Sequence, residues 1–115
     1  MRYFDGLDLP TSSFSGDINL RTSNFSGNVI FRTSSFSKKV IFRDSIFSSY
    51  EDFSGSDFVR EINFENTHFR EKVIFDYADL RAGSFQETDF RGVDLSGALI
   101  DEMTKLPVLS QTESN

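Results

Sequence analysis

A few side chains in this sequence have the chemistry of a hydrolytic site. The single histidine, His68, is a candidate general base, and the recurring serines are candidate nucleophiles. Both roles need an oriented partner and a pocket. His68 directly precedes Phe69 on what we predict to be an outward position of a flat face, so it has neither. The serines recur every eleven residues at a position predicted to be small and inward: Ser12, Ser23, Ser34, Ser45 and Ser56. We therefore predict no catalytic residues, with the serines as spacers that hydrogen-bond to nearby backbone.

The acidic side chains are the next candidates, since clustered carboxylates bind Ca²⁺. The pairs Asp5 with Asp8 and Asp101 with Glu102 are too sparse to supply six to eight oxygen ligands. The chain has no cysteine, which excludes disulfides and thiolate metal sites. We predict no metal and no cofactor.

Net charge limits the class of partner. The charge is −6 and the isoelectric point about 4.6, the wrong sign for neutralising phosphates, so no direct nucleic-acid binding is expected. No stretch approaches the ~20 apolar residues of a transmembrane helix, and the N-terminal segment lacks the apolar region of a signal peptide. We expect no membrane contact, a cytoplasmic location and an unidentified protein partner.

An internal repeat dominates the sequence from Thr11 onward. Blocks of eleven residues, such as TSNFSGNVIFR and TSSFSKKVIFR, carry a phenylalanine at the fourth position and a bulky residue at the tenth. All 14 phenylalanines fall on bulky positions spaced five or six residues apart. This period fits neither a helix nor a flat strand, but it fits a chain that turns a corner about every five residues.

With four sides per coil, the bulky positions sort into four inward ladders. One is Phe4, Phe25, Phe47, Phe69 and Phe90. Another is Leu9, Phe31, Phe53, Phe75 and Leu95. The third is Phe14, Phe36, Phe58, Leu80 and Ile100. The fourth is Leu20, Phe42, Phe64 and Phe85. Stacked rings at the coil spacing are expected to form the core.

The later part of the chain resembles the pentapeptide repeat family, whose units read roughly A-[D/N]-[L/F]-x-x. Ala78-Asp79-Leu80 and Val93-Asp94-Leu95 match that unit. The eleven-residue blocks resemble a phenylalanine-rich variant with one extra residue at every second corner, an insertion that stops after Phe75. The extra residues are Asp17, Asn28, Lys39, Tyr50, Glu61 and Lys72.

The resemblance implies an all-β fold, a right-handed quadrilateral β-helix of about four to five coils over residues 1–100. Residues 101–115 are expected to form a C-terminal capping segment and flexible tail, with Met103, Leu106 and Leu109 folding over the last coil. Within it, LIDEMTKLP resembles the closing segment common in cyanobacterial members of the family.

Two features interrupt the regular pattern. Glu51 occupies an inward position where other blocks have valine or isoleucine. Because an unpaired buried carboxylate is costly, we expect a local bulge at Tyr50-Glu51 that turns Glu51 to solvent, with an acidic binding spot as the alternative.

Ile30 and Ile74 occupy outward positions flanking Asp52. They are either isolated exposed apolar residues or a shallow docking strip, so the possible interaction surface is Ile30, Glu51, Asp52 and Ile74.

The sequence thus favours a non-catalytic structural or protein-interaction module. The alternative role is an acidic mimic of DNA that binds DNA gyrase or another nucleic-acid-binding protein, a role known in the family. Interspersed basic residues, among them Arg21, Arg43 and Lys38, weaken that alternative. Open solenoid ends invite association, so we expect either a monomer or an end-to-end dimer.

Overall fold

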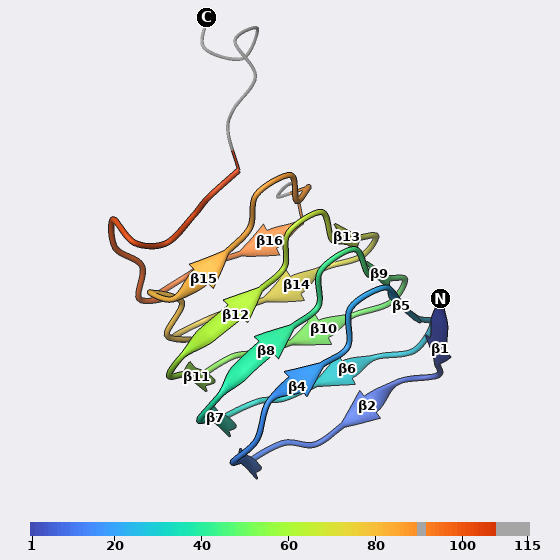
Figure 1. Ribbon diagram of the computed structural model, residues 1–115, viewed down its shortest axis with the longest axis horizontal. Coiled ribbons are helices and arrows are strands. Elements are labelled where there is room, and N and C mark those ends of the chain that lie inside the picture. The colour runs from blue at the N-terminus through green and yellow to red at the C-terminus, as the bar shows by residue number, and fades with distance from the viewer. Residues whose placement is uncertain (90–91, 108–115) are drawn as a thin grey trace, which may run out of the picture.

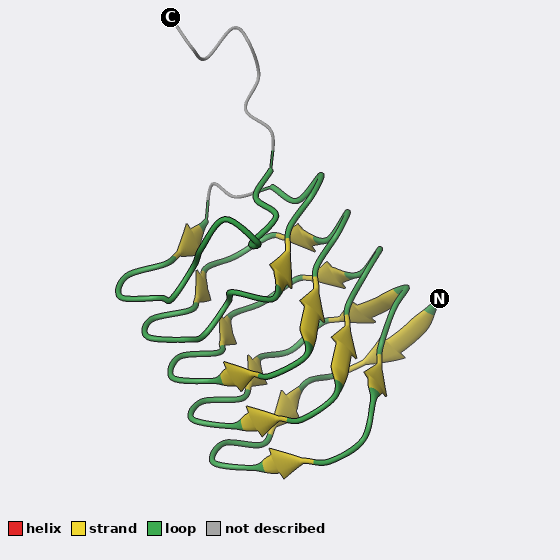
Figure 2. Ribbon diagram, turned by 60° about the vertical axis from the view of Figure 1, so that its left-hand side comes forward, coloured by secondary structure: helices red, strands yellow, loops and turns green. Residues whose placement is uncertain are grey.

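The structure is a computed structural model that describes residues 1–89 and 92–107, and it is built from stacked coils. Within these ranges the secondary structure is short β-strands of two or three residues, and there is no helix (Figure 1). Each strand hydrogen-bonds in parallel to strands of the neighbouring coils. The predicted all-β solenoid is therefore confirmed, and Figure 2 shows its coils lying side by side.

The strands form four parallel sheets, one on each side of the solenoid. The first sheet contains β1 (Arg2–Phe4), β5 (Ser23–Phe25), β9 (Ile46–Phe47) and β13 (His68–Phe69). The second contains β2 (Leu7–Asp8), β6 (Val29–Ile30), β10 (Glu51–Asp52), β14 (Val73–Ile74) and β16 (Val93–Asp94).

The other two sheets complete the solenoid. The third contains β3 (Ser13–Phe14), β7 (Ser35–Phe36) and β11 (Asp57–Phe58), and single bridges continue it through Asp79 and Leu99. The fourth contains β4 (Ile18–Asn19), β8 (Lys39–Ile41), β12 (Glu61–Asn63) and β15 (Gly83–Ser84), and a bridge adds Lys105.

Phenylalanine rings fill the interior in two kinds of contact. Along a side they stack: the Phe25 and Phe47 centroids lie 4.8 Å apart with planes at 7°, and the Phe36 and Phe58 centroids also lie 4.8 Å apart. Between sides they meet edge to face, as Phe42 does with Phe47 at 5.3 Å and 64°. Both geometries are favourable for aromatic pairs. The rings consequently interlock around the coil as well as along the rod.

The ladders are least buried towards the ends of the described solenoid. Phe4, Phe14, Leu20 and Leu95 are half-buried against the core. Leu9 and Ile100, at the ends of their ladders, are 40% and 44% exposed. In the first and last described coils an inward side chain contacts a neighbouring coil on one side only, which explains the loss of burial. Phe90 lies outside the described residues.

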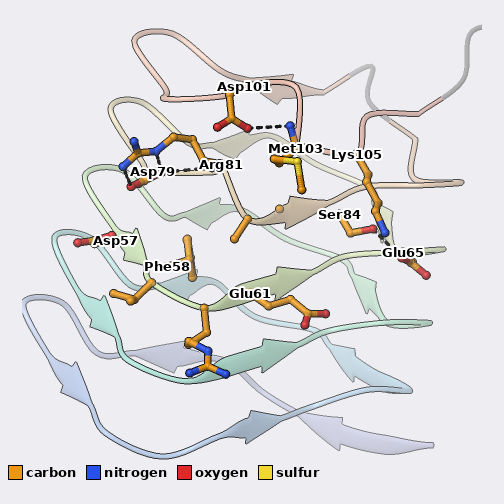
Figure 3. A pocket seen from close by; sticks show the side chains of 14 residues that line it. Asp57, Phe58, Glu61, Glu65, Asp79, Arg81, Ser84, Asp101, Met103 and Lys105 are labelled. Carbon is orange, nitrogen blue, oxygen red and sulfur yellow. Dashed lines mark hydrogen bonds and ion pairs between the residues drawn. The ribbon is translucent and has the colours of Figure 1, made fainter.

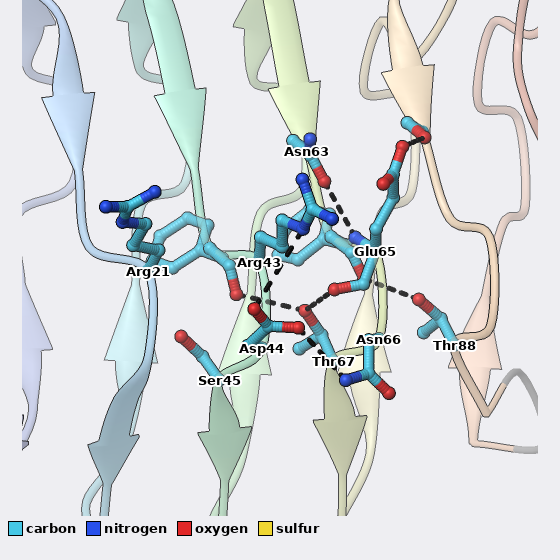
Figure 4. Close-up of polar contacts among 12 residues, drawn as sticks. Arg21, Arg43, Asp44, Ser45, Asn63, Glu65, Asn66, Thr67 and Thr88 are labelled. Carbon is cyan, nitrogen blue, oxygen red and sulfur yellow. Dashed lines mark hydrogen bonds and ion pairs between the residues drawn. The ribbon is translucent and has the colours of Figure 1, made fainter. Parts of the chain in front are cut away.

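Hydroxyl groups satisfy backbone carbonyls at the corners of the coils. The Ser56 Oγ donates to the Phe31 carbonyl at 2.6 Å. The Thr67 Oγ1 donates in the same way to the Phe42 carbonyl at 3.0 Å (Figure 4). Ser34 and Ser45 make the equivalent bond to the preceding coil. This confirms that the small inward residues are spacers with satisfied hydroxyls. Each bond spans 25 residues, so it ties one coil to the next.

Candidate interaction surfaces

The outward side chains of the second sheet form a strip in which acidic and apolar residues alternate. Strand pairing places Asp8 opposite Ile30, Ile30 opposite Asp52, Asp52 opposite Ile74, and Ile74 opposite Asp94. We call these five residues the second-sheet strip. Ile30 and Ile74 are half-buried, and the structure places them on either side of Asp52, as the sequence predicted.

Asp52 is held firmly at the centre of this strip. It is 5% exposed, its Oδ1 accepts the Ser54 backbone N–H at 2.9 Å, and its Oδ2 accepts the Tyr50 hydroxyl at 3.2 Å. The Arg32 Nε lies 3.7 Å from the same Oδ2. Burial, followed by the charge of Asp52, raises the pKa of the Tyr50 phenol. The carboxylate is therefore fixed in place, with one cation close by.

Glu51 contradicts the expectation that a bulge turns it to solvent. It is 0% exposed and lies in β10, in regular register with Val29 and Val73. The Glu51 backbone N–H donates to the Lys72 carbonyl at 3.1 Å, and the Val29 N–H donates to the Tyr50 carbonyl at 3.0 Å. These bonds to both neighbouring coils keep β10 in line, and they direct the Glu51 side chain inward.

Neither carboxyl oxygen of Glu51 has a hydrogen-bond partner among the described residues. Burial raises the pKa of this carboxyl to about 9, and the nearby charge of Glu71 adds to the shift. Glu51 is consequently protonated at neutral pH and behaves as a neutral, unsatisfied polar group in the core. An acidic binding spot would need an accessible carboxylate, which this position does not offer.

A hollow in the described surface lies at the corner between the third and fourth sheets (Figure 3). Asn63 follows Asp57 by six positions, and Lys105 follows Leu99 by six, but Ser84 follows Asp79 by only five. The corner of residues 79–84 is thus one residue shorter than the corners on either side of it. It leaves a depression of about 780 Å³ that is open to solvent and that we call the recess.

The recess has a floor of small residues and charged walls. Ala82, Gly83 and Ser84 line the floor, and Val59 and Met103 stand on the two flanking corners. These two apolar side chains are 60% and 71% exposed. Sequence reasoning missed this site, although its signal was present in the end of the insertions after Phe75. Recognising it required knowing which corners are stacked against one another.

The residues weighed for catalysis and metal binding are not brought together. His68 is exposed on the first sheet, one coil from Ile46. Within residues 1–89 and 92–107, no group of histidine, cysteine, aspartate and glutamate side chains could hold a metal ion. The same described residues contain no helix long and apolar enough to cross a membrane.

The C-terminal segment does not cap the solenoid in the predicted way. Met103 and Leu106 are exposed rather than folded over the last coil. Instead, Lys105 continues the fourth sheet through a bridge to Ser84, and the Thr104 Oγ1 donates to the Leu80 carbonyl at 2.9 Å. This segment therefore repeats the hydroxyl bond of the earlier coils. Leu109 lies outside the described residues.

Comparison with known proteins gives a family match for one segment of the chain. Residues 64–106 match a family model described as pentapeptide repeats in nine copies, and no curated protein matches the sequence. The matched segment is less than half of the chain. The sheets nevertheless run from it into the phenylalanine-rich coils without a break, since β14 pairs with β10. Both parts of the chain thus build one solenoid.

Proposed function

Since this chain is a pentapeptide-repeat protein, we propose that it is a non-catalytic module that binds another protein through the second-sheet strip. The observation that supports this most is the alternation of acidic and apolar side chains along that side. Asp8, Ile30, Asp52, Ile74 and Asp94 are in register across consecutive coils.

The strip has the properties of a docking surface rather than of scattered residues. Successive coils are ~4.8 Å apart, so equivalent side chains form an ordered row. Ile30 and Ile74 each offer apolar area without being fully exposed, and Asp52 between them is already oriented by Ser54 and Tyr50. A preorganised surface loses less entropy on binding than a mobile one. The partner we expect presents apolar and basic side chains along one direction.

The acidic mimic of DNA remains a second candidate, and the acids of the same side favour it. Asp5, Glu71 and Asp76 lie on the coil segments next to the strip and add to its negative charge. Basic residues on the fourth-sheet side, Arg21 and Arg43, oppose it. A gyrase supercoiling assay separates the two roles, because a DNA mimic inhibits the enzyme at micromolar protein and an unrelated interaction module does not.

The test compares two matched double variants as bait against extract from the native cell. Ile30→Asn with Ile74→Asn removes the apolar groups of the strip. Ile41→Asn with Ile46→Asn is the control, because both residues are outward and half-buried but lie on the fourth and first sheets. We expect a partner retained by the wild type and the control and lost from the strip variant. A partner retained by all three, with melting temperatures matched, would contradict the proposal.

A further inference from the structure

The recess lies where one coil lacks a residue that its two neighbours possess. Ala82 occupies the place of Glu61 in the coil before and of Met103 in the coil after, and no residue of its corner matches Arg60. Gly83 stands in the inward row with Ile62, where a Cβ would lie 3.0 Å from the Leu80 carbonyl oxygen. The backbone of this corner therefore lies closer to the core than the corners on either side, and this path of the backbone gives the recess its depth.

The charges around the recess are not balanced. Arg81 is matched to Asp79, since its Nε and Nη2 donate to the two carboxylate oxygens at 2.9 and 2.7 Å. This pair lies at one side of the recess, on the coil between those of Asp57 and Asp101 (Figure 3). Apart from this pair, the acidic residues of the described lining outnumber the basic ones. The acidic residues are Asp57, Glu61, Glu65 and Asp101, and the basic residues are Arg60 and Lys105.

Asp57 and Asp101 are the carboxylates best placed to meet a ligand. They flank the Arg81–Asp79 pair on the coils before and after, and both add to the raised pKa of Arg81, after the larger effect of Asp79. Within residues 1–89 and 92–107 neither carboxylate forms a salt bridge. Asp101 Oδ1 accepts the Met103 N–H at 2.9 Å, which fixes its direction.

The apolar side chains of the recess complement these carboxylates. Val59 and Met103 stand on opposite walls and are largely exposed. A lysine or arginine side chain combines an apolar stem with a cationic head, so its stem can pack against both walls while its head stays beside acids. A carboxylate ligand would instead meet the surplus of acids in the lining.

We propose that the recess binds a lysine or arginine side chain from an extended segment of a partner protein. The side chain takes the volume of the residue that the 79–84 corner lacks. Its stem lies between Val59 and Met103, and its cation lies beside Asp57 and Asp101. This site is distinct from the second-sheet strip, so it stands whether or not the strip binds a partner.

The experiment is an NMR titration of the full chain with two small probes. One probe is N-acetyl-arginine methylamide, and the other is the neutral isostere N-acetyl-citrulline methylamide. We expect the arginine probe to shift backbone amides of residues 59–61, 82–84 and 101–105. The citrulline probe should bind several-fold more weakly. Each of Asp57→Asn and Asp101→Asn should weaken arginine binding by about two- to fivefold, the range of an exposed ion pair.

Two further variants distinguish a built site from general attraction to an acidic protein. Glu87→Gln removes an exposed acid that belongs neither to the recess nor to the second-sheet strip, so it should leave the titration unchanged. Insertion of one serine between Arg81 and Ala82 restores the corner length of the neighbouring coils, so it should abolish binding while the chain still folds. Equal shifts with both probes, or arginine shifts that survive Asp57→Asn with Asp101→Asn, would overturn the proposal even if the insertion variant failed to fold.

Discussion

Glu51 and Val73 lie directly opposite each other in adjacent strands of the second sheet, with both side chains buried in the core. A carboxyl group therefore occupies the position that valine holds in the coils before and after it. Its oxygens lack hydrogen-bond partners among the described residues, so it weakens the core that it helps to fill. The register of β10 nevertheless remains regular, because backbone bonds to two coils outweigh the local cost.

Replacing Glu51 with valine should stabilise the protein. Val29 and Val73 show that the side chain fits this row, and the change removes two unsatisfied oxygens. We expect the free energy of unfolding at pH 7 to rise by about 2–4 kcal/mol. Urea denaturation measures it. An unchanged or lower value would show that the Glu51 oxygens have partners in solution.

The stability of the wild type should also depend on pH through Glu51. Its pKa is raised from 4.5 to about 9 by folding, so between these values the folded state holds one more proton than the unfolded state. The contribution of this group is fully present below pH 4.5 and is lost as pH rises towards 9. The slope is about −1.4 kcal/mol per pH unit.

The matched control for this pH dependence is Glu51→Gln, which keeps the shape and the buried polar atoms but cannot ionise. We expect denaturation midpoints of the wild type to fall between pH 5 and pH 8 by more than those of the variant. Because all other titrating groups are shared, the difference isolates Glu51. Parallel curves for the two proteins would contradict a buried, protonated carboxyl.

Truncating a central phenylalanine should cost far more than truncating one in the first coil. Phe47 and Phe58 are at most 2% exposed, and each stacks on a neighbouring ring. We expect Phe47→Ala and Phe58→Ala to lower the free energy of unfolding by about 3–5 kcal/mol, through lost transfer energy and a residual cavity. Phe14→Ala, at a half-buried site, should cost less than half as much. Equal losses at all three positions would contradict the burial gradient.

Removing a corner hydroxyl should leave a buried carbonyl without its partner. Ser56→Ala deletes the donor to the Phe31 carbonyl, and Thr67→Val deletes the donor to the Phe42 carbonyl without changing the side-chain shape. We expect each to destabilise the solenoid by about 1–3 kcal/mol. Ser35→Ala is the control, because Ser35 is exposed on the third sheet. Thermal melts that do not separate Ser56→Ala from Ser35→Ala would count against this role.

The sequence predicted the solenoid well because its signal is periodic. Each phenylalanine marks one side, so Phe25 and Phe47 could be placed in one ladder from their spacing alone. Local exceptions were harder to predict. Whether Glu51 points inward depends on two free energies: the cost of burying its carboxyl group, and the stabilisation from the backbone hydrogen bonds of β10. Protonation of the carboxyl group lowers the cost of burial. The recess forms because a short corner is stacked between two longer ones. The spacing of residues within one coil does not show which corners are stacked on one another.

Gly55 should be more sensitive to substitution than a glycine with ordinary backbone. Its φ is 66°, in the left-handed region that side chains enter at a cost, and Thr33 of the neighbouring coil adopts φ 54° at the equivalent corner. The corner therefore accepts a side chain, but with strain. We expect Gly55→Ala to lower the free energy of unfolding by about 1 kcal/mol. Gly16→Ala, with nothing within 4 Å of the added Cβ, should be neutral or slightly stabilising. Equal melting temperatures for the two variants would show that the corner geometry imposes no strain.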